Sequence, residues 1–268
     1  MSGRPLPVLG SDAEWSGGPV TAAMHCILAP NPSPWTLDGT NTWIVGERDV
    51  VIVDPGPHDP AHWQAIRAHL DEHNARVIAV VLTHGHIDHS ESARPVAEAL
   101  GVGVRAIDPG HRLGAEGLGE GDVIDLGTDE LAVVLTPGHS ADSASLVLRR
   151  DRSLLTGDTV LGRGTTVVAW PDGNLAEYLD SLHRLRDRAV EVDRILPGHG
   201  PVLDAPVAVL EGYLAHRAAR LDEVRAVLDS GVTDPTRIVE IVYAGVPREV
   251  WPAAELSVRA QVEYLRQA

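Results

Sequence analysis

The chain has 268 residues, 44% hydrophobic and 22% charged, which suits one large α/β domain with a small appendage and a sizeable core. Its formal net charge of −16 weighs against non-specific nucleic-acid binding, which needs a basic surface. The single cysteine, Cys26, excludes an intrachain disulfide, and without a signal-peptide stretch or a long apolar run the protein is expected in the cytoplasm, with no membrane partner.

Residues 1–20 are rich in glycine, proline and acidic side chains and are expected to form a loose arm. Beyond them, β-branched runs alternate with amphipathic segments, which indicates two sheets with helices outside. Asp59 can cap a helix and Pro60 suits its first turn. The expected strands are 22–28, 43–45, 50–53, 77–82, 102–107, 130–135, 145–148, 153–156 and 194–196, and the expected helices are 60–73, 92–100 and 175–188.

After Pro206 the pattern becomes helical, and three helices are expected at 207–228, 236–243 and about 253–266. This unit is too small to be very stable alone and is expected to dock on the main domain. The predicted domains are therefore 1–205 and 206–268.

Four side chains that can ligate metal ions follow the buried strand predicted at 77–82. His84 and His86 fall on the same side of an extended turn because side chains alternate, and Asp88 and His89 come next as a helix begins. Imidazole and carboxylate ligands suit zinc and related divalent ions. A chance cluster is the alternative in a chain with 13 histidines, but four such ligands within six residues rarely arise by chance.

Three more segments place one ligand type just past the carboxyl end of a predicted strand. They are Pro-Gly-His139, Gly-Asp158 and Pro-Gly-His199. Sites in α/β folds form at that edge of a sheet, and the neighbouring glycines permit tight turns. Each segment alone is typical of a plain turn, whereas the joint pattern predicts one metal site.

The His-x-His-x-Asp-His motif at 84–89, followed by His139, Asp158 and His199, resembles the metallo-β-lactamase superfamily over residues 20 to about 205. The resemblance implies an αββα sandwich with two Zn²⁺ per chain, Mn²⁺ and Fe²⁺ being the alternatives. It implies that His84, His86 and His139 hold one ion, that Asp88, His89 and His199 hold the other, and that Asp158 bridges them.

Further stretches resemble the lactamase-β-like protein 2 family: Thr36–Trp43, Gly157–Thr166, Pro197–Val202 and Tyr213–Arg217. That resemblance implies a C-terminal winged-helix-like unit and an endoribonuclease activity selective for single strands. One departure puts nucleic-acid binding by this unit in doubt, because the sequence after the third helix leaves no residues for a β-hairpin wing.

The predicted function is dinuclear metal-dependent hydrolysis, in which a hydroxide shared by two ions attacks and Asp88 and Asp158 act in catalysis. The resemblance implies a phosphodiester in single-stranded RNA as the substrate, and Arg163 or Arg217 is then expected to contact the backbone. The alternative is a small-molecule ester or thioester hydrolase of glyoxalase-II type. A non-hydrolytic protein, such as a mononuclear iron dioxygenase, is a third class. Substrate, native metal and oligomeric state do not follow from the sequence.

Several other residues carry weaker expectations. Asp54 is expected to accept a hydrogen bond from a ligand loop or a histidine. His58, His62, His69 and His73 are expected to decorate a helix surface, and Cys26 to pack in the core. His216 and Arg217 are expected on a solvated or interdomain helix face.

Overall fold

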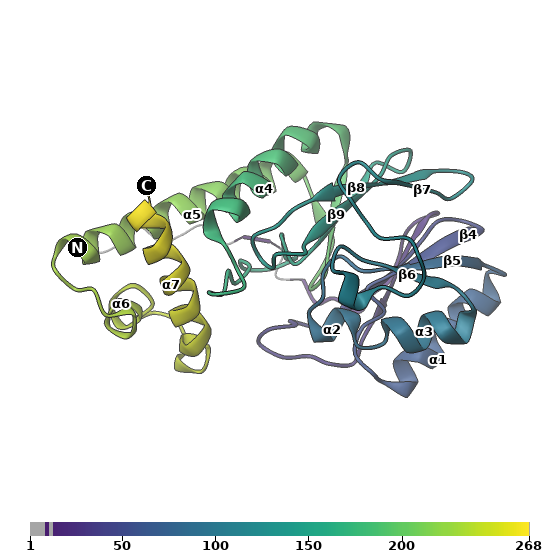
Figure 1. Cartoon of the computed structure of the whole chain (residues 1–268), viewed down its shortest axis with the longest axis horizontal. Coiled ribbons are helices and arrows are strands. Elements are labelled where there is room, and N and C mark those ends of the chain that lie inside the picture. Colours follow the sequence, from purple (N-terminus) through teal and green to yellow (C-terminus); the bar gives the residue numbers. More distant parts are fainter. Residues whose placement is uncertain (1–8, 11–12, 268) are drawn as a thin grey trace.

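The computed structural model describes residues 9–10 and 13–267, and its main part consists of two facing six-stranded sheets. Helices α1 and α3 cover the outer face of one sheet, while α4 and the first half of α5 cover the other (Figure 1). This is the αββα sandwich that the sequence predicts.

The first sheet has the order β1-β2-β3-β4-β5-β6. Its first four strands pair antiparallel, and β4, β5 and β6 pair parallel because α1 and the α2–α3 segment connect them. The strands are β1 Gly18–Thr21, β2 Met24–Leu28, β3 Asn41–Val45, β4 Asp49–Val53, β5 Arg76–Val81 and β6 Gly103–Arg105, and the helices are α1 Pro60–Glu72, α2 Ile87–Ser90 and α3 Ala93–Leu100.

The second sheet has the order β12-β11-β10-β9-β8-β7. Only β10 and β11 pair parallel, and α4 connects them. The strands are β7 Val123–Asp125, β8 Glu130–Leu135, β9 Ala144–Leu148, β10 Ser153–Gly157, β11 Arg194–Pro197 and β12 Leu203–Asp204, α4 spans Leu175–Arg188, and short 3₁₀ turns lie at Pro109–His111 and Ala189–Glu191.

The core between the sheets is built from the inward faces of the strands. Trp43 and Val53 of the first sheet and Leu146 and Leu155 of the second are each no more than 2% exposed. Cys26 also lies in this cluster, as expected. Burial of these side chains holds the two sheets together and thereby fixes the loops at their edges relative to one another.

The C-terminal helices are α5 Pro206–Asp229, α6 Pro235–Val242 and α7 Trp251–Gln267, with a 3₁₀ turn at Arg248–Val250. Figure 1 shows α6 and α7 at the far end of α5, away from the sheets. The first half of α5 packs in the core outside the second sheet, and its second half packs with α6 and α7. A domain boundary at 205/206 stays a prediction. None of the described helices is long and apolar enough to cross a membrane.

Three differences from the predicted elements have physical reasons. Residues Gly18–Thr21 form β1 on the edge of the first sheet, so the loose arm predicted for 1–20 is wrong there; most of its other residues lie outside the described ones. Strands β7 and β12 were not predicted, because two or three residues are too few to display an alternating pattern. His62 is 3% exposed and contacts Thr42, so it does not decorate the surface of α1.

Candidate metal centre

Four loops at one edge of the sandwich bring the seven predicted residues together. These loops follow β5, β8, β10 and β11 and carry one or more histidine or aspartate side chains each. The donor atoms form two groups joined by one aspartate. We call His84, His86 and His139 the first cluster, and Asp88, His89 and His199 the second cluster.

In the first cluster, two imidazole nitrogens lie close to a third. Nδ1 of His86 lies 3.0 Å from Nε2 of His84 and 3.0 Å from Nε2 of His139. Three imidazole nitrogens facing a common point match the three-histidine donor set that holds a divalent zinc-type ion.

The second cluster lies deeper. Nε2 of His89 and Nε2 of His199 are 3.2 Å apart, and Oδ2 of Asp88 lies 3.5 Å and 3.2 Å from these two nitrogens. The side chain of His89 is 0% exposed and that of His199 is 2% exposed. This set combines one carboxylate with two imidazoles.

Asp158 lies between the two clusters. Its Oδ2 is 3.7 Å from Nε2 of His139 and 3.3 Å from Nε2 of His199, while its Oδ1 is 3.5 Å from Nε2 of His89. Oδ1 is buried and has no hydrogen-bond partner. A buried carboxylate oxygen without a partner and imidazole nitrogens that face one another are both satisfied by divalent cations, so the residues present fit such ions.

Glycine is required where the loops pass closest to the donors. A Cβ at Gly198 would lie 2.4 Å from Oδ1 of Asp158 and 2.8 Å from Cε1 of His89. A Cβ at Gly138 would lie 2.3 Å from the backbone of Tyr178 on α4. These glycines, noted in the sequence beside His199 and His139, therefore admit the close approach that the centre needs.

Asp54 supports the centre from behind. Its Oδ2 is 2.9 Å from Nδ1 of His89 and accepts a hydrogen bond from the Thr83 hydroxyl at 2.6 Å. That hydroxyl lies 3.0 Å from Nδ1 of His84, so one carboxylate orients a histidine of each cluster. Asp54 has a φ of +51°, an uncommon conformation that aspartate tolerates better than most residues. The expectation for Asp54 is confirmed.

Two orienting partners in the segment after β10 were missed by sequence reasoning. Nε2 of His86 lies 3.3 Å from Oδ2 of Asp172, and Nδ1 of His139 lies 2.9 Å from the carbonyl oxygen of Val167. Asp172 belongs to no sequence motif, and the position of a backbone carbonyl group cannot be predicted from residue types.

The electrostatics of the two clusters differ. Burial lowers the pKa of His84 well below its ordinary value and also lowers the pKa of His139. Burial opposes charge on His89 and His199 too, but the neighbouring carboxylates together outweigh it, those of Asp158 and Asp54 at His89 and those of Asp158 and Asp88 at His199. The pKa of His89 is therefore raised well above its usual range and that of His199 to about 9. His84 and His139 of the first cluster thus offer neutral donors, whereas the second cluster pairs its imidazoles with carboxylates.

A cavity of about 380 Å³ opens onto the donors. Besides donors of both clusters and Asp158, its lining includes the loop around Trp35 and Leu37, residues 161 and 163–167, and Val250 from the 3₁₀ turn between α6 and α7. Trp35 is 49% exposed. The C-terminal helical unit therefore contributes to the wall of the cavity, which the sequence did not indicate.

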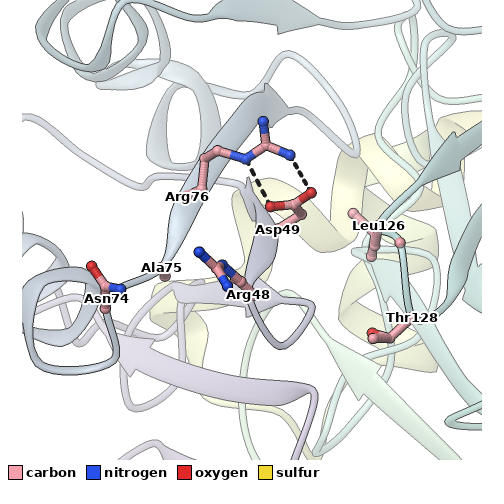
Figure 2. Close-up of a pocket in the computed structure, with 8 residues that line it drawn as sticks. Arg48, Asp49, Asn74, Ala75, Arg76, Leu126 and Thr128 are labelled. Atoms are coloured by element: carbon pink, nitrogen blue, oxygen red, sulfur yellow. Dashed lines mark hydrogen bonds and ion pairs between the residues drawn. The ribbon is translucent and has the colours of Figure 1, made fainter.

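A wider hollow of about 700 Å³ lies at the start of β4 and β5 (Figure 2). Its one carboxylate, Asp49, is held by Arg76, whose Nε lies 2.8 Å from Oδ1. The described lining contains no histidine or cysteine, so this hollow offers no alternative metal centre.

Comparison with known families identifies the class of protein. Residues 35–199 match the family described as the metallo-beta-lactamase superfamily, and residues 235–267 match the beta-lactamase associated winged helix domain. The chain belongs to the metallo-β-lactamase superfamily. The second match confirms the predicted winged-helix-like unit, although the structure has no strand among the described residues after Asp204.

Individual relatives agree with this assignment. A Caenorhabditis elegans protein named beta-lactamase-like protein 2 homolog is 34% identical over 253 residues, covering 91% of this chain and 84% of the relative. An Aspergillus fumigatus protein named atrochrysone carboxyl ACP thioesterase is 28% identical, covering 84% and 74%. The crystal structure of a beta-lactamase domain protein from Burkholderia ambifaria has the same fold, with a TM-score of 0.81 at 24% identity and coverage of 97% and 92%. Fold, family and clusters define a metal-dependent hydrolase.

Proposed function

We propose that the chain hydrolyses small-molecule esters or thioesters by means of two divalent ions, most naturally Zn²⁺. The first cluster would hold one ion, the second cluster the other, and Asp158 would bridge them. The observation that carries the choice of substrate is the cavity wall beyond the donors, where Trp35, Leu37 and Val250 offer an apolar surface for an acyl group.

The arginines expected to hold RNA are occupied by internal partners. Arg217 is 5% exposed and buried behind the centre, so the expectation that it contacts a nucleic-acid backbone is wrong. Arg163 lines the cavity, but its guanidinium pairs with Asp38 and donates to the carbonyl oxygen of Ala13 at 2.7 Å. With a net charge of −16, the chain offers little to attract a polyanion.

The reaction adds water across an acyl C–O or C–S bond and yields a carboxylic acid with an alcohol or thiol. When bound, the ions would supply an activated water molecule and polarise the carbonyl group. The chain contributes the arrangement of the donors, because His84, His89 and His199 are held by buried partners, and the apolar wall excludes bulk water from the acyl group. Asp88, which lines the cavity, is assigned as proton acceptor.

The name of the A. fumigatus relative supports acyl chemistry. Single-stranded RNA remains the second candidate, because residues 235–267 match a winged-helix domain and domains of that architecture bind nucleic acid in other proteins. Phosphodiester cleavage by this chain stays a prediction.

One assay separates the two candidates. Metal-loaded protein is incubated with acyl thioesters, with small esters and with labelled single-stranded RNA, and His84→Ala serves as the control. We expect thioester or ester turnover that the control lacks. RNA cleavage that the control lacks, without turnover of any acyl substrate, would overturn the proposal.

The apolar wall can be tested separately with a matched pair of tryptophans. Trp35 lines the cavity, whereas the similarly exposed Trp170 does not. We expect Trp35→Ala to raise KM for a substrate with a large apolar acyl group about ten-fold, in line with the loss of one aromatic contact, and Trp170→Ala to leave it unchanged. Equal behaviour of the two variants would remove Trp35 from the binding site.

A further inference from the structure

Arg217 on α5 is the only arginine buried among the residues that the structure describes. No carboxylate lies within ion-pair distance of it in that part of the chain, and its Nε has no hydrogen-bond partner. Burying a guanidinium without a carboxylate is costly, so its remaining contacts need an explanation.

Those contacts are directed at the metal centre. The guanidinium lies 4.9 Å from the centroid of the Tyr178 ring, and its Nη2 donates to the carbonyl oxygen of Thr166. The Tyr178 hydroxyl in turn donates to the carbonyl oxygen of Thr159 at 2.7 Å. Tyr178 therefore holds the start of the segment that follows Asp158, and Arg217 holds its end.

This segment contacts two of the metal-donor residues, one aspartate and one histidine. The Thr166 hydroxyl donates to the carbonyl oxygen of Asp158, the residue between the two clusters. The next carbonyl along the chain, that of Val167, is 2.9 Å from Nδ1 of His139. A hydrogen bond at this nitrogen fixes the ring so that Nε2 points to the first cluster.

Docking of α5 alone does not explain the buried charge. The Tyr213 hydroxyl, one turn earlier on α5, already accepts from the Leu161 amide at 2.9 Å and lies 3.1 Å from the carbonyl oxygen of Gly164. Leu210 and Tyr213 are both 0% exposed against the second sheet. The helix is thus anchored without Arg217.

We propose that Arg217 is a positioning residue for the metal centre: through Thr166 and Val167 it sets the orientation of His139 and so the affinity of the first cluster for its ion. The proposal rests on the ligand set given under Proposed function. The histidines of the second cluster are oriented by Asp54 and Gly39 instead, and Thr166 contacts Asp158 only at its backbone carbonyl oxygen, so Arg217 should affect the first cluster's ion and not the other.

The test is titration of ion-free protein with Co²⁺, followed by calorimetry and by absorption spectroscopy. His86→Ala identifies the binding step that belongs to the first cluster. In Arg217→Met we expect that step to weaken about 10- to 100-fold, as for the loss of other orienting partners of metal ligands, while the other step keeps its affinity. Arg217→Lys, which retains the charge but cannot donate to Thr166 and stack on Tyr178 together, should show the same selective loss.

Arg220→Met is the matched control. Arg220 lies one turn further along α5, stacks on Tyr243 at 4.4 Å and donates to the carbonyl oxygen of Val242, away from the centre. Both steps should be unchanged in this variant. Unchanged binding in either folded Arg217 variant, or an equal loss at both steps, would overturn the proposal. If the wild type took up no ion, the proposed function itself would fail, which is a different result.

Discussion

The two donor clusters share Asp158 but differ in what lies behind them. In the second cluster, the Nδ1 atoms of His89 and His199 face the carboxylate of Asp54 at 2.9 Å and the carbonyl oxygen of Gly39 at 3.1 Å, all within the buried edge of the sandwich. In the first cluster, the side chain of His86 is 41% exposed and that of its partner Asp172 is 55% exposed.

The ligands of the two clusters are therefore not held equally rigidly before an ion binds, although both clusters lie at the same edge of the sandwich. The partners of His89 and His199 lie just after β4 and just before β3, where Asn41 donates a hydrogen bond to the carbonyl oxygen of Pro197 in the second sheet. Those of His86 and His139 lie in the single segment between β10 and α4. Buried and fully hydrogen-bonded ligands lose less freedom when an ion binds, so we expect the second cluster to hold its ion more tightly.

The largest effect should come from the residue that both clusters share. Asp158→Ala removes the bridge, and we expect kcat/KM for the acyl substrate to fall at least about a thousand-fold while the unfolding temperature changes little, because the aspartate lies on a loop outside the core. Steady-state kinetics and thermal unfolding check this. Turnover near the wild-type rate with a normal metal content would contradict the shared role.

A sharper comparison replaces, one at a time, each of the two carboxylates that orient histidines. Asp54→Asn should weaken binding of the second cluster's ion about 10- to 100-fold, because Asp54 is 1% exposed and contacts His89 directly, and binding of the first cluster's ion less, because Asp54 reaches His84 only through Thr83. Asp172→Asn should weaken binding of the first cluster's ion no more than about five-fold, because solvent screens this pair. Metal titration measures both. Equal losses of metal affinity in the two variants would show that burial of the orienting carboxylate does not distinguish the clusters.

An effect on folding stability rather than on metal binding is expected in the layer beneath Asp54. His62 lies 2.9 Å from the Thr42 hydroxyl, which donates to the Asp54 carbonyl oxygen at 2.7 Å. Burial lowers the pKa of His62 from 6.5 to about 4, so the unfolded chain binds the proton more readily. The stabilising contribution is therefore present above about pH 6.5 and is lost as the pH falls towards 4.

Denaturant unfolding at pH 7.5 and pH 5 gives the size of this contribution. Between these values the wild type should lose about 2 kcal/mol more of its unfolding free energy than His62→Gln does. His183→Gln, at an exposed position on α4, should follow the wild type. Parallel pH profiles for the wild type and His62→Gln would show that His62 does not titrate as its burial requires.

The parts of this centre that follow from local sequence patterns could be predicted. Each ligand stands just after a strand, and strand ends meet at one edge, so the convergence of His84, His139 and His199 could be predicted. Helix α4 was predicted with its observed bounds, and in the structure the Asn174 side chain accepts hydrogen bonds from the first-turn amides.

Other parts depend on contacts between distant segments. Asp172 and Val250 reach the centre only because α4 and the C-terminal helices pack as they do. His62 and Arg217 could have been found: His62 shares the spacing of Ile66 and Leu70, and Arg217 that of Leu210, Leu221 and Val224, so both fall on apolar helix faces. A polar residue on such a face signals a buried partner.

The unequal support of the two clusters is tested most directly by calorimetric titration of the ion-free wild type with Zn²⁺, beside the same titration of His86→Ala. We expect two equivalents in two resolved steps, with His86→Ala losing only the weaker one. A single equivalent in the wild type, or loss of the tighter step in His86→Ala, would contradict this account of the centre.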